Sequence, residues 1–116
     1  LVLHYCLEAA SNLETNDVSV EVIDLPTLRP LDTATIIDSV KKTGKLLIVH
    51  EDNLTGGIGA EIAAVVAHEA FEFLDGPIMR LCGPDVPTMP FAKTLEDAYL
   101  PTTDKIANAI QKLAAY

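Results

Sequence analysis

The fold is decided by the stretch Lys45-Leu46-Leu47-Ile48-Val49-His50-Glu51-Asp52-Asn53-Leu54-Thr55-Gly56-Gly57-Ile58-Gly59-Ala60-Glu61-Ile62. Its continuous apolar run, Leu46 to Val49, is typical of a parallel strand buried on both faces. A polar loop follows from His50 to Thr55, and three glycines then lead into apolar residues that recur at helical spacing up to about Phe73. The stretch therefore predicts a strand, a glycine-rich turn and a helix in direct succession.

The same alternation of strands and helices continues on both sides of this unit. We expect two more strands, at Val18–Leu25 and Ile78–Cys82. We expect helices at Leu1–Leu13, between Asp32 and Gly44, and after Thr102 or Thr103. A short helical turn is expected within Leu95–Leu100. This order predicts an α/β domain with a mostly parallel sheet and helices on both faces. Three strands make a narrow sheet, so we also expect a strand before Leu1 or a partner chain to cover the helices.

Length and charge narrow the classes of function. A chain of 116 residues suits one domain, and no apolar run reaches the ~18 residues of a membrane span. The formal net charge of -9 repels phosphate backbones and anionic lipid, which disfavours nucleic acid and membranes as partners. It attracts a basic protein partner, although the same charge could simply keep the protein soluble. Cys6 and Cys82 lack any metal-binding spacing and are expected to be reduced, buried thiols.

The turn from Thr55 to Glu61 lies where α/β folds often bind anions, because unpaired N–H groups and the helix dipole point outward there. The dinucleotide pattern G-x-G-x-x-G fails, since its third glycine falls on Ile62, and no Gly-Lys-Ser/Thr completes a P-loop. Two interpretations stay open. Gly56, Gly57 and Gly59 could let the helix pack closely on the sheet or on a neighbouring subunit, or the turn could hold an anion.

Catalytic patterns are incomplete. His50, Glu51 and Asp52 follow a buried strand, but neighbouring residues of a strand face opposite ways, and loop polarity explains them equally well. His68-Glu69-Ala70-Phe71-Glu72 lacks the second histidine of a zinc motif, and no serine lies in G-x-S-x-G. We therefore assign no catalytic, metal-binding or cofactor-binding residue in this chain.

Four ordered segments resemble one known family: Val20–Asp32, Lys42–Glu51, Thr55–Ile62 and Leu95–Pro101. They look like the carboxy-terminal domain of the β subunit of thiamine-diphosphate-dependent 2-oxo acid dehydrogenases, within the transketolase-like group. The resemblance covers nearly all of residues 1–116, as a single domain. It implies a three-layer α/β/α fold with a mostly parallel sheet.

The resemblance also implies where the chemistry lies. In that family a strand and a glycine-containing link precede the first helix, and a pyrimidine-binding domain comes before them. The motif that holds magnesium and the cofactor's diphosphate belongs to the α subunit. Thiamine diphosphate and magnesium are thus expected in the intact oxidoreductase, whose substrate would be pyruvate, a branched-chain 2-oxo acid or acetoin, and the isolated fragment is expected to be non-catalytic.

The implied partners are the α subunit and a second β subunit in an α2β2 heterotetramer, and the peripheral-subunit-binding domain of the dihydrolipoyl acyltransferase. By position, the resemblance places docking on Asp75 and on the terminal carboxylate of Tyr116, while a further family acid is replaced by Met79. Of the two interpretations of Gly56, Gly57 and Gly59, the resemblance favours helix packing near a subunit interface. The implied location is the bacterial cytoplasm or the mitochondrial matrix. Two alternatives remain: a stand-alone phosphate- or nucleotide-binding module, and the matching domain of another transketolase-like enzyme.

Overall fold

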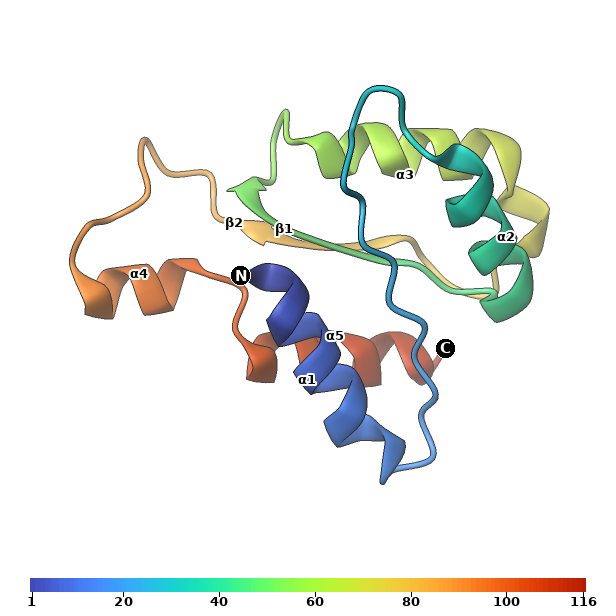
Figure 1. Cartoon of the computed structure of the whole chain (residues 1–116), viewed down its shortest axis with the longest axis horizontal. Helices are drawn as coiled ribbons and strands as arrows, with labels where there is room; N and C mark the ends of the chain where they lie inside the picture. Colours follow the sequence, from blue (N-terminus) through green and yellow to red (C-terminus); the bar gives the residue numbers. More distant parts are fainter.

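A two-stranded parallel sheet forms the middle layer of the computed structural model, which describes all 116 residues (Figure 1). Strand β1 (Leu47–Asn53) pairs with β2 (Met79–Gly83), with Leu47 opposite Met79 and a register shift before Asn53. The helices in chain order are α1 (Val2–Glu14), α2 (Thr33–Thr43), α3 (Ile58–Glu69), α4 (Lys93–Tyr99) and α5 (Thr103–Ala114), and a 3₁₀ turn (Phe71–Phe73) follows α3.

Helices cover both faces of the sheet, so the predicted three-layer α/β architecture is confirmed. One face packs on α2 and α3, and the other on α1 and α5 (Figure 1). The core is correspondingly divided: seven buried residues join α2, β1 and α3 and the turn after α3, namely Ile36, Ile37, Val40, Ile48, Ile62, Val66 and Ala70. On the other side, Ala9, Leu13, Ile106 and Leu113 are buried between α1 and α5. No helix is both long enough and apolar enough to cross a membrane.

The predicted ends of α2 are confirmed. Asp32 caps the helix, because its carboxylate accepts the backbone N–H of Thr35 at 3.2 Å and the Thr35 hydroxyl at 2.7 Å. These two bonds, the hydroxyl first, lower the pKa of Asp32. At the other end Gly44 adopts the left-handed conformation (φ 72°), as a helix-terminating glycine should. Thr102 caps α5 in the same way as Asp32 caps α2.

The predicted strand at Val18–Leu25 is wrong. The segment is extended but pairs with no strand, and none of the backbone–backbone hydrogen bonds involves Ser19 to Leu25. Its β-branched residues favour a strand only when a neighbour supplies the ladder, and β1 is not that neighbour. A cavity of about 530 Å³ lies between the segment and β1 instead, bounded also by helices from both layers.

Three boundaries also differ from those predicted. β1 runs to Asn53, so His50, Glu51 and Asp52 belong to the strand and not to a loop. α3 ends at Glu69, and the chain reaches Phe73 through the 3₁₀ turn. The short turn expected within Leu95–Leu100 is the two-turn helix α4.

Gly44→Ala should lower the free energy of unfolding by at least about 1–2 kcal/mol, the cost of placing an L-residue in the left-handed region. A Cβ there would also overlap the carboxylate of Asp75, whose N–H donates to Gly44 O at 2.7 Å. Urea unfolding measures the loss. Gly56→Ala is the matched control, since Gly56 has φ 78° but no atom within 4 Å of the added methyl. Equal losses in the two variants would contradict the steric part of this explanation.

Candidate functional site

The glycine-rich turn is packed against the side chain of His50 on β1. The N–H of Gly59 donates to His50 Nε2 at 3.2 Å. A Cβ on Gly59 would lie 2.5 Å from that nitrogen, and a Cβ on Gly57 would lie 2.8 Å from His50 Cε1. Both glycines are buried, so any side chain would push the imidazole away. The absence of Cβ atoms at these two positions lets the start of α3 rest directly on β1.

His50 is a structural acceptor in this arrangement. Because Nε2 accepts from Gly59, the proton of the neutral ring lies on Nδ1, which is buried and has no partner within the chain. Cys82 Sγ lies 3.2 Å from the same Nε2, and burial raises the pKa of the Cys82 thiol and keeps it protonated. Glu51 and Asp52 are exposed and form no bond with His50. The structure therefore forms no hydrogen-bonded pair between His50 and either of these carboxylates.

The third glycine of the turn, Gly56, is not explained by close packing. Gly56 adopts φ 78° and has open space around it, so it serves the direction of the chain and not close packing. It is exposed, together with Thr55 before it. The turn is therefore exposed at Thr55 and Gly56 and closely packed at Gly57 and Gly59.

A carboxylate of the same chain occupies the mouth of the turn. Asp85, from the loop after β2, accepts the N–H of Thr55 at 2.9 Å and its hydroxyl at 2.6 Å. The Thr55 hydroxyl, then the backbone amides of Thr55 and Leu54, and then the charge of Arg80 lower the pKa of Asp85. Arg80 Nη1 also donates to Leu54 O at 3.0 Å. The loops that follow the two strands are thereby joined at the carboxyl edge of the sheet.

This arrangement does not fit a phosphate or diphosphate. Two amides of the turn, those of Thr55 and Gly59, already donate to Asp85 and His50. A bound phosphate would also face the negative charge of Asp85. No three His, Cys, Asp or Glu side chains come together in a group that could hold a metal ion.

The two docking residues inferred from the resemblance lie together. Asp75 and Gly76 form the turn before β2, and a Cβ on Gly76 would lie 3.2 Å from Tyr116 Cβ. Asp75 and Tyr116 are both exposed. Residues from two distant parts of the sequence therefore share one corner of the surface, at the end of α2 and α5 (Figure 1).

Sequence reasoning did not identify Asp85 or Arg80 as part of the turn. Asp85 lies in an irregular stretch with three prolines, and nothing in its neighbours indicates a bond to a residue thirty positions earlier. The predicted parallel sheet could have indicated the pairing of Thr55 with Asp85. Residues just past the ends of adjacent parallel strands meet at one edge.

Comparisons with known proteins agree on one family. The family model described as "Transketolase, C-terminal domain" matches residues 1–106. The chain is 43% identical over 116 residues to "2-oxoisovalerate dehydrogenase subunit beta" of Bacillus subtilis, and the alignment covers 100% of this chain and 36% of that protein. It is 47% identical over 112 residues to "Pyruvate dehydrogenase E1 component subunit beta, mitochondrial" of Dictyostelium discoideum, covering 97% of this chain and 31% of that one.

A solved structure agrees with these relatives. "Split gene transketolase, inactive beta4 tetramer" superimposes with a TM-score of 0.78 at 27% identity, over 97% of this chain and 36% of the other. The chain thus spans about a third of the length of the relatives that it matches.

Gly59→Ala should destabilise the protein by about 1 kcal/mol, although helix propensity alone would favour alanine by a similar amount. The added methyl collides with the His50 ring. Removing the ring in a His50→Ala background should reduce the loss, because the Ile48 methyl at 3.2 Å is then the remaining close contact of the added Cβ. A double-mutant cycle in urea measures this coupling. The same effect of Gly59→Ala in both backgrounds would disprove the packing.

Thr55→Val should raise the pKa of Asp85 towards its ordinary value, because the largest cause of the lowering is the lost hydroxyl. A carboxyl whose pKa is lowered by folding stabilises the native state above its unfolded pKa, about 3.9, and loses that contribution as pH falls through the folded value. The variant should therefore be less stable than the parent near neutral pH, and the gap should shrink in acid. Carbon NMR titration measures the pKa of Asp85, and urea unfolding near neutral pH and in acid measures the difference in stability. Thr27→Val, whose hydroxyl bonds only Pro30 O, is the control.

Proposed function

This chain belongs to the transketolase C-terminal domain family, and from that premise we propose that it is the assembly and docking domain of the β subunit of a 2-oxo acid dehydrogenase. The intact complex would oxidatively decarboxylate a 2-oxo acid and pass the acyl group to lipoamide. The observation that carries the proposal is identity of 43–48% to proteins named as β subunits of such enzymes, over 95–100% of this chain.

The domain's own contribution would be assembly and not bond-making. Thiamine diphosphate with magnesium would supply the decarboxylation chemistry in the intact enzyme. The residues of this chain do not offer a site for that group, since the turn's mouth is filled by Asp85 and no metal-binding cluster forms. Relatives named for 2-oxoisovalerate and for pyruvate are similar to this chain at 43% and 47%, which supports a choice of 2-oxo acid made outside this domain.

Assembly with an α subunit and a second β subunit would use the carboxyl edge of the sheet. Leu54 and Val86, which flank the Thr55–Asp85 pair, are 38% and 37% exposed. Apolar side chains exposed beside a rigid, bonded turn are typical of a protein contact. Gly56, Gly57 and Gly59 would act indirectly, because they set the position of that turn. A solved relative described as a tetramer is compatible with such a contact.

Docking would use the corner formed by Asp75 and Tyr116. The formal net charge of -9 suits a basic partner, and the peripheral-subunit-binding domain of a dihydrolipoyl acyltransferase is the partner proposed. The relatives include mitochondrial proteins and bacterial ones. The proposed location is accordingly the cytoplasm of a bacterium or the matrix of a mitochondrion.

The two alternatives receive less support. A stand-alone phosphate or nucleotide module would need free amides in the turn, and the turn binds the chain's own carboxylate instead. The matching domain of another transketolase-like enzyme is compatible with the fold, but the identity to the solved split-gene transketolase is 27%, against 47% to a pyruvate dehydrogenase β subunit.

Asp75→Lys should weaken binding of the basic peripheral-subunit-binding domain by at least about tenfold, since an attraction becomes a repulsion between charges at the contact. Isothermal titration calorimetry at low salt measures the dissociation constant. Raising the salt about tenfold shortens the screening length and should weaken the parent's binding as well.

Asp97→Lys is the matched control, because it makes the same charge change on exposed α4, at the opposite end of the molecule (Figure 1). It should change the affinity much less than Asp75→Lys. Equal weakening by both variants would mean that only net charge matters and that no docking site exists at Asp75. Binding unchanged in both would reject the basic partner.

A further inference from the structure

The link between α2 and β1 is bonded to both segments of the docking corner, the surface formed by Asp75 and Tyr116. Gly44, the first residue of the link, accepts the N–H of Asp75 on its carbonyl oxygen at 2.7 Å. Lys45, the next residue, donates from Nζ to Leu113 O at 3.3 Å, in the last turn of α5. Two successive residues thus hold two parts of the chain that the sequence keeps far apart.

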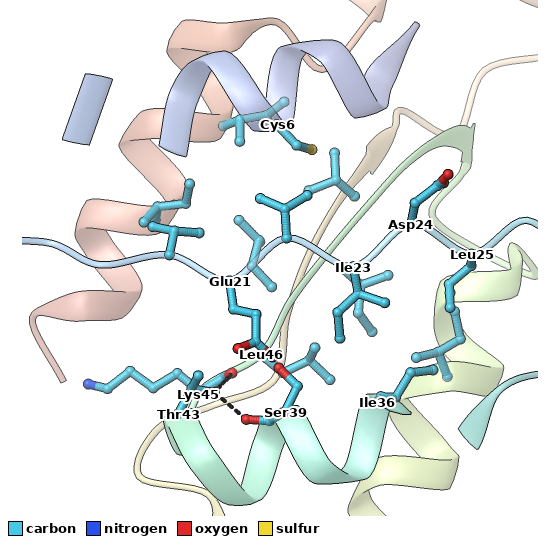
Figure 2. A pocket seen from close by; sticks show the side chains of 18 of the residues that line it. Cys6, Glu21, Ile23, Asp24, Leu25, Ile36, Ser39, Thr43, Lys45 and Leu46 are labelled. Carbon is cyan, nitrogen blue, oxygen red and sulfur yellow. Dashed lines mark hydrogen bonds between the residues drawn. The ribbon is translucent and has the colours of Figure 1, made fainter. Parts of the chain in front are cut away.

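The side chain of Lys45 reaches the end of α5. The residue is half-buried, and Figure 2 shows its side chain extended, with the nitrogen pointing away from Ile36 of α2. Its backbone is held as well, because the Thr43 hydroxyl donates to Lys45 O at 3.2 Å. Leu113 O accepts a second bond, from the N–H of Tyr116 at 3.2 Å. The Lys45 ammonium therefore bonds to the same carbonyl that fixes the backbone of Tyr116.

A cation at this position suits the end of a helix. The last carbonyls of a helix lack partners within it and carry the negative end of its dipole, so a nearby ammonium stabilises them. Packing acts at the same point, since a Cβ on Gly76 would lie 3.2 Å from Tyr116 Cβ and 3.6 Å from Leu113 Cδ1. The end of α5 is thus held from two sides, by Lys45 and by the turn before β2.

The charge of Lys45 argues against a direct contact with the proposed partner. That partner is basic, so a cation turned towards it would weaken the contact. The ammonium instead donates to a carbonyl of the same chain. Its influence on docking would therefore be geometric, because a surface that is already held in its binding shape loses less conformational freedom on association.

We propose that Lys45 is a positioning residue for docking. It holds the last turn of α5 beside the Asp75–Gly76 turn, so that Asp75 and Tyr116 present one rigid surface to a basic partner. The inference rests on the docking role proposed above, and it adds a residue that acts through its own chain and not through the partner.

Lys45→Met should weaken binding of the basic peripheral-subunit-binding domain at least about fivefold, because the end of α5 is no longer held in place. The direction of the change is diagnostic, since loss of a positive charge would by itself strengthen attraction to a basic partner. Lys45→Arg, which keeps the charge and the donors, should restore most of the affinity. Isothermal titration calorimetry of the full chain at low salt measures the dissociation constants. Hydrogen exchange of the Tyr116 N–H should also become faster in Lys45→Met.

Lys105→Met is the matched control. Lys105 is also half-buried and also donates to backbone carbonyls, those of Ala98 at 2.7 Å and Leu100 at 2.8 Å. The substitution removes the same charge, but near the other end of α5, away from the C-terminus (Figure 1). It should leave the affinity unchanged or slightly higher. Urea unfolding of both variants separates a loss of stability from a loss of binding.

The inference and the docking proposal fail in different ways. Equal affinities of Lys45→Met and Lys105→Met, while Asp75→Lys still weakens binding, would overturn the positioning role and leave the docking site standing. No effect of Asp75→Lys would reject the docking site, and the positioning role with it. Should Lys45→Met not fold, Lys45→Gln, which is shorter and uncharged, replaces it, and an unchanged affinity of that variant would equally overturn the inference.

Discussion

The contact on which the rest of the structure depends is the packing of the His50 side chain against the glycine-rich turn. It joins β1 to the start of α3 through a hydrogen bond of 3.2 Å and through two positions where no side chain fits. This contact fixes where the chain leaves the sheet. The position of Thr55 follows, and with it the bond to Asp85 that joins the loops after both strands. A packing constraint in the core thus sets the shape of the exposed edge.

Local signals predicted most of the fold because they act over a few residues. Asp32 and Gly44 end α2 through bonds and dihedral angles that involve only their neighbours, and both were correctly predicted. Val18–Leu25 was not, because a strand needs a partner that the segment's own residues cannot supply. Its β-branched composition describes what the segment would do beside another strand. The pairing of Thr55 with Asp85 was missed for a similar reason, since it links positions that only the sheet brings together.

Few residues of the domain are fully buried. Only 19 of 116 residues are buried, and seven of them form one cluster on the side of the sheet that faces α2 and α3. Helices of both layers present apolar side chains to the slot between β1 and Val18–Leu25. Because burial of apolar area is the main favourable term in folding, covering the apolar walls of the slot would stabilise this domain.

The molecule consequently presents two surfaces of opposite chemistry. The slot between β1 and Val18–Leu25 is lined mostly by apolar side chains from both layers of helices. The corner at Asp75 and Tyr116 is exposed and belongs to a strongly acidic chain, so the docking proposed there would act at long range and would be screened by salt. Contacts at the first surface would add to the apolar core, while contacts at the second would depend on charge.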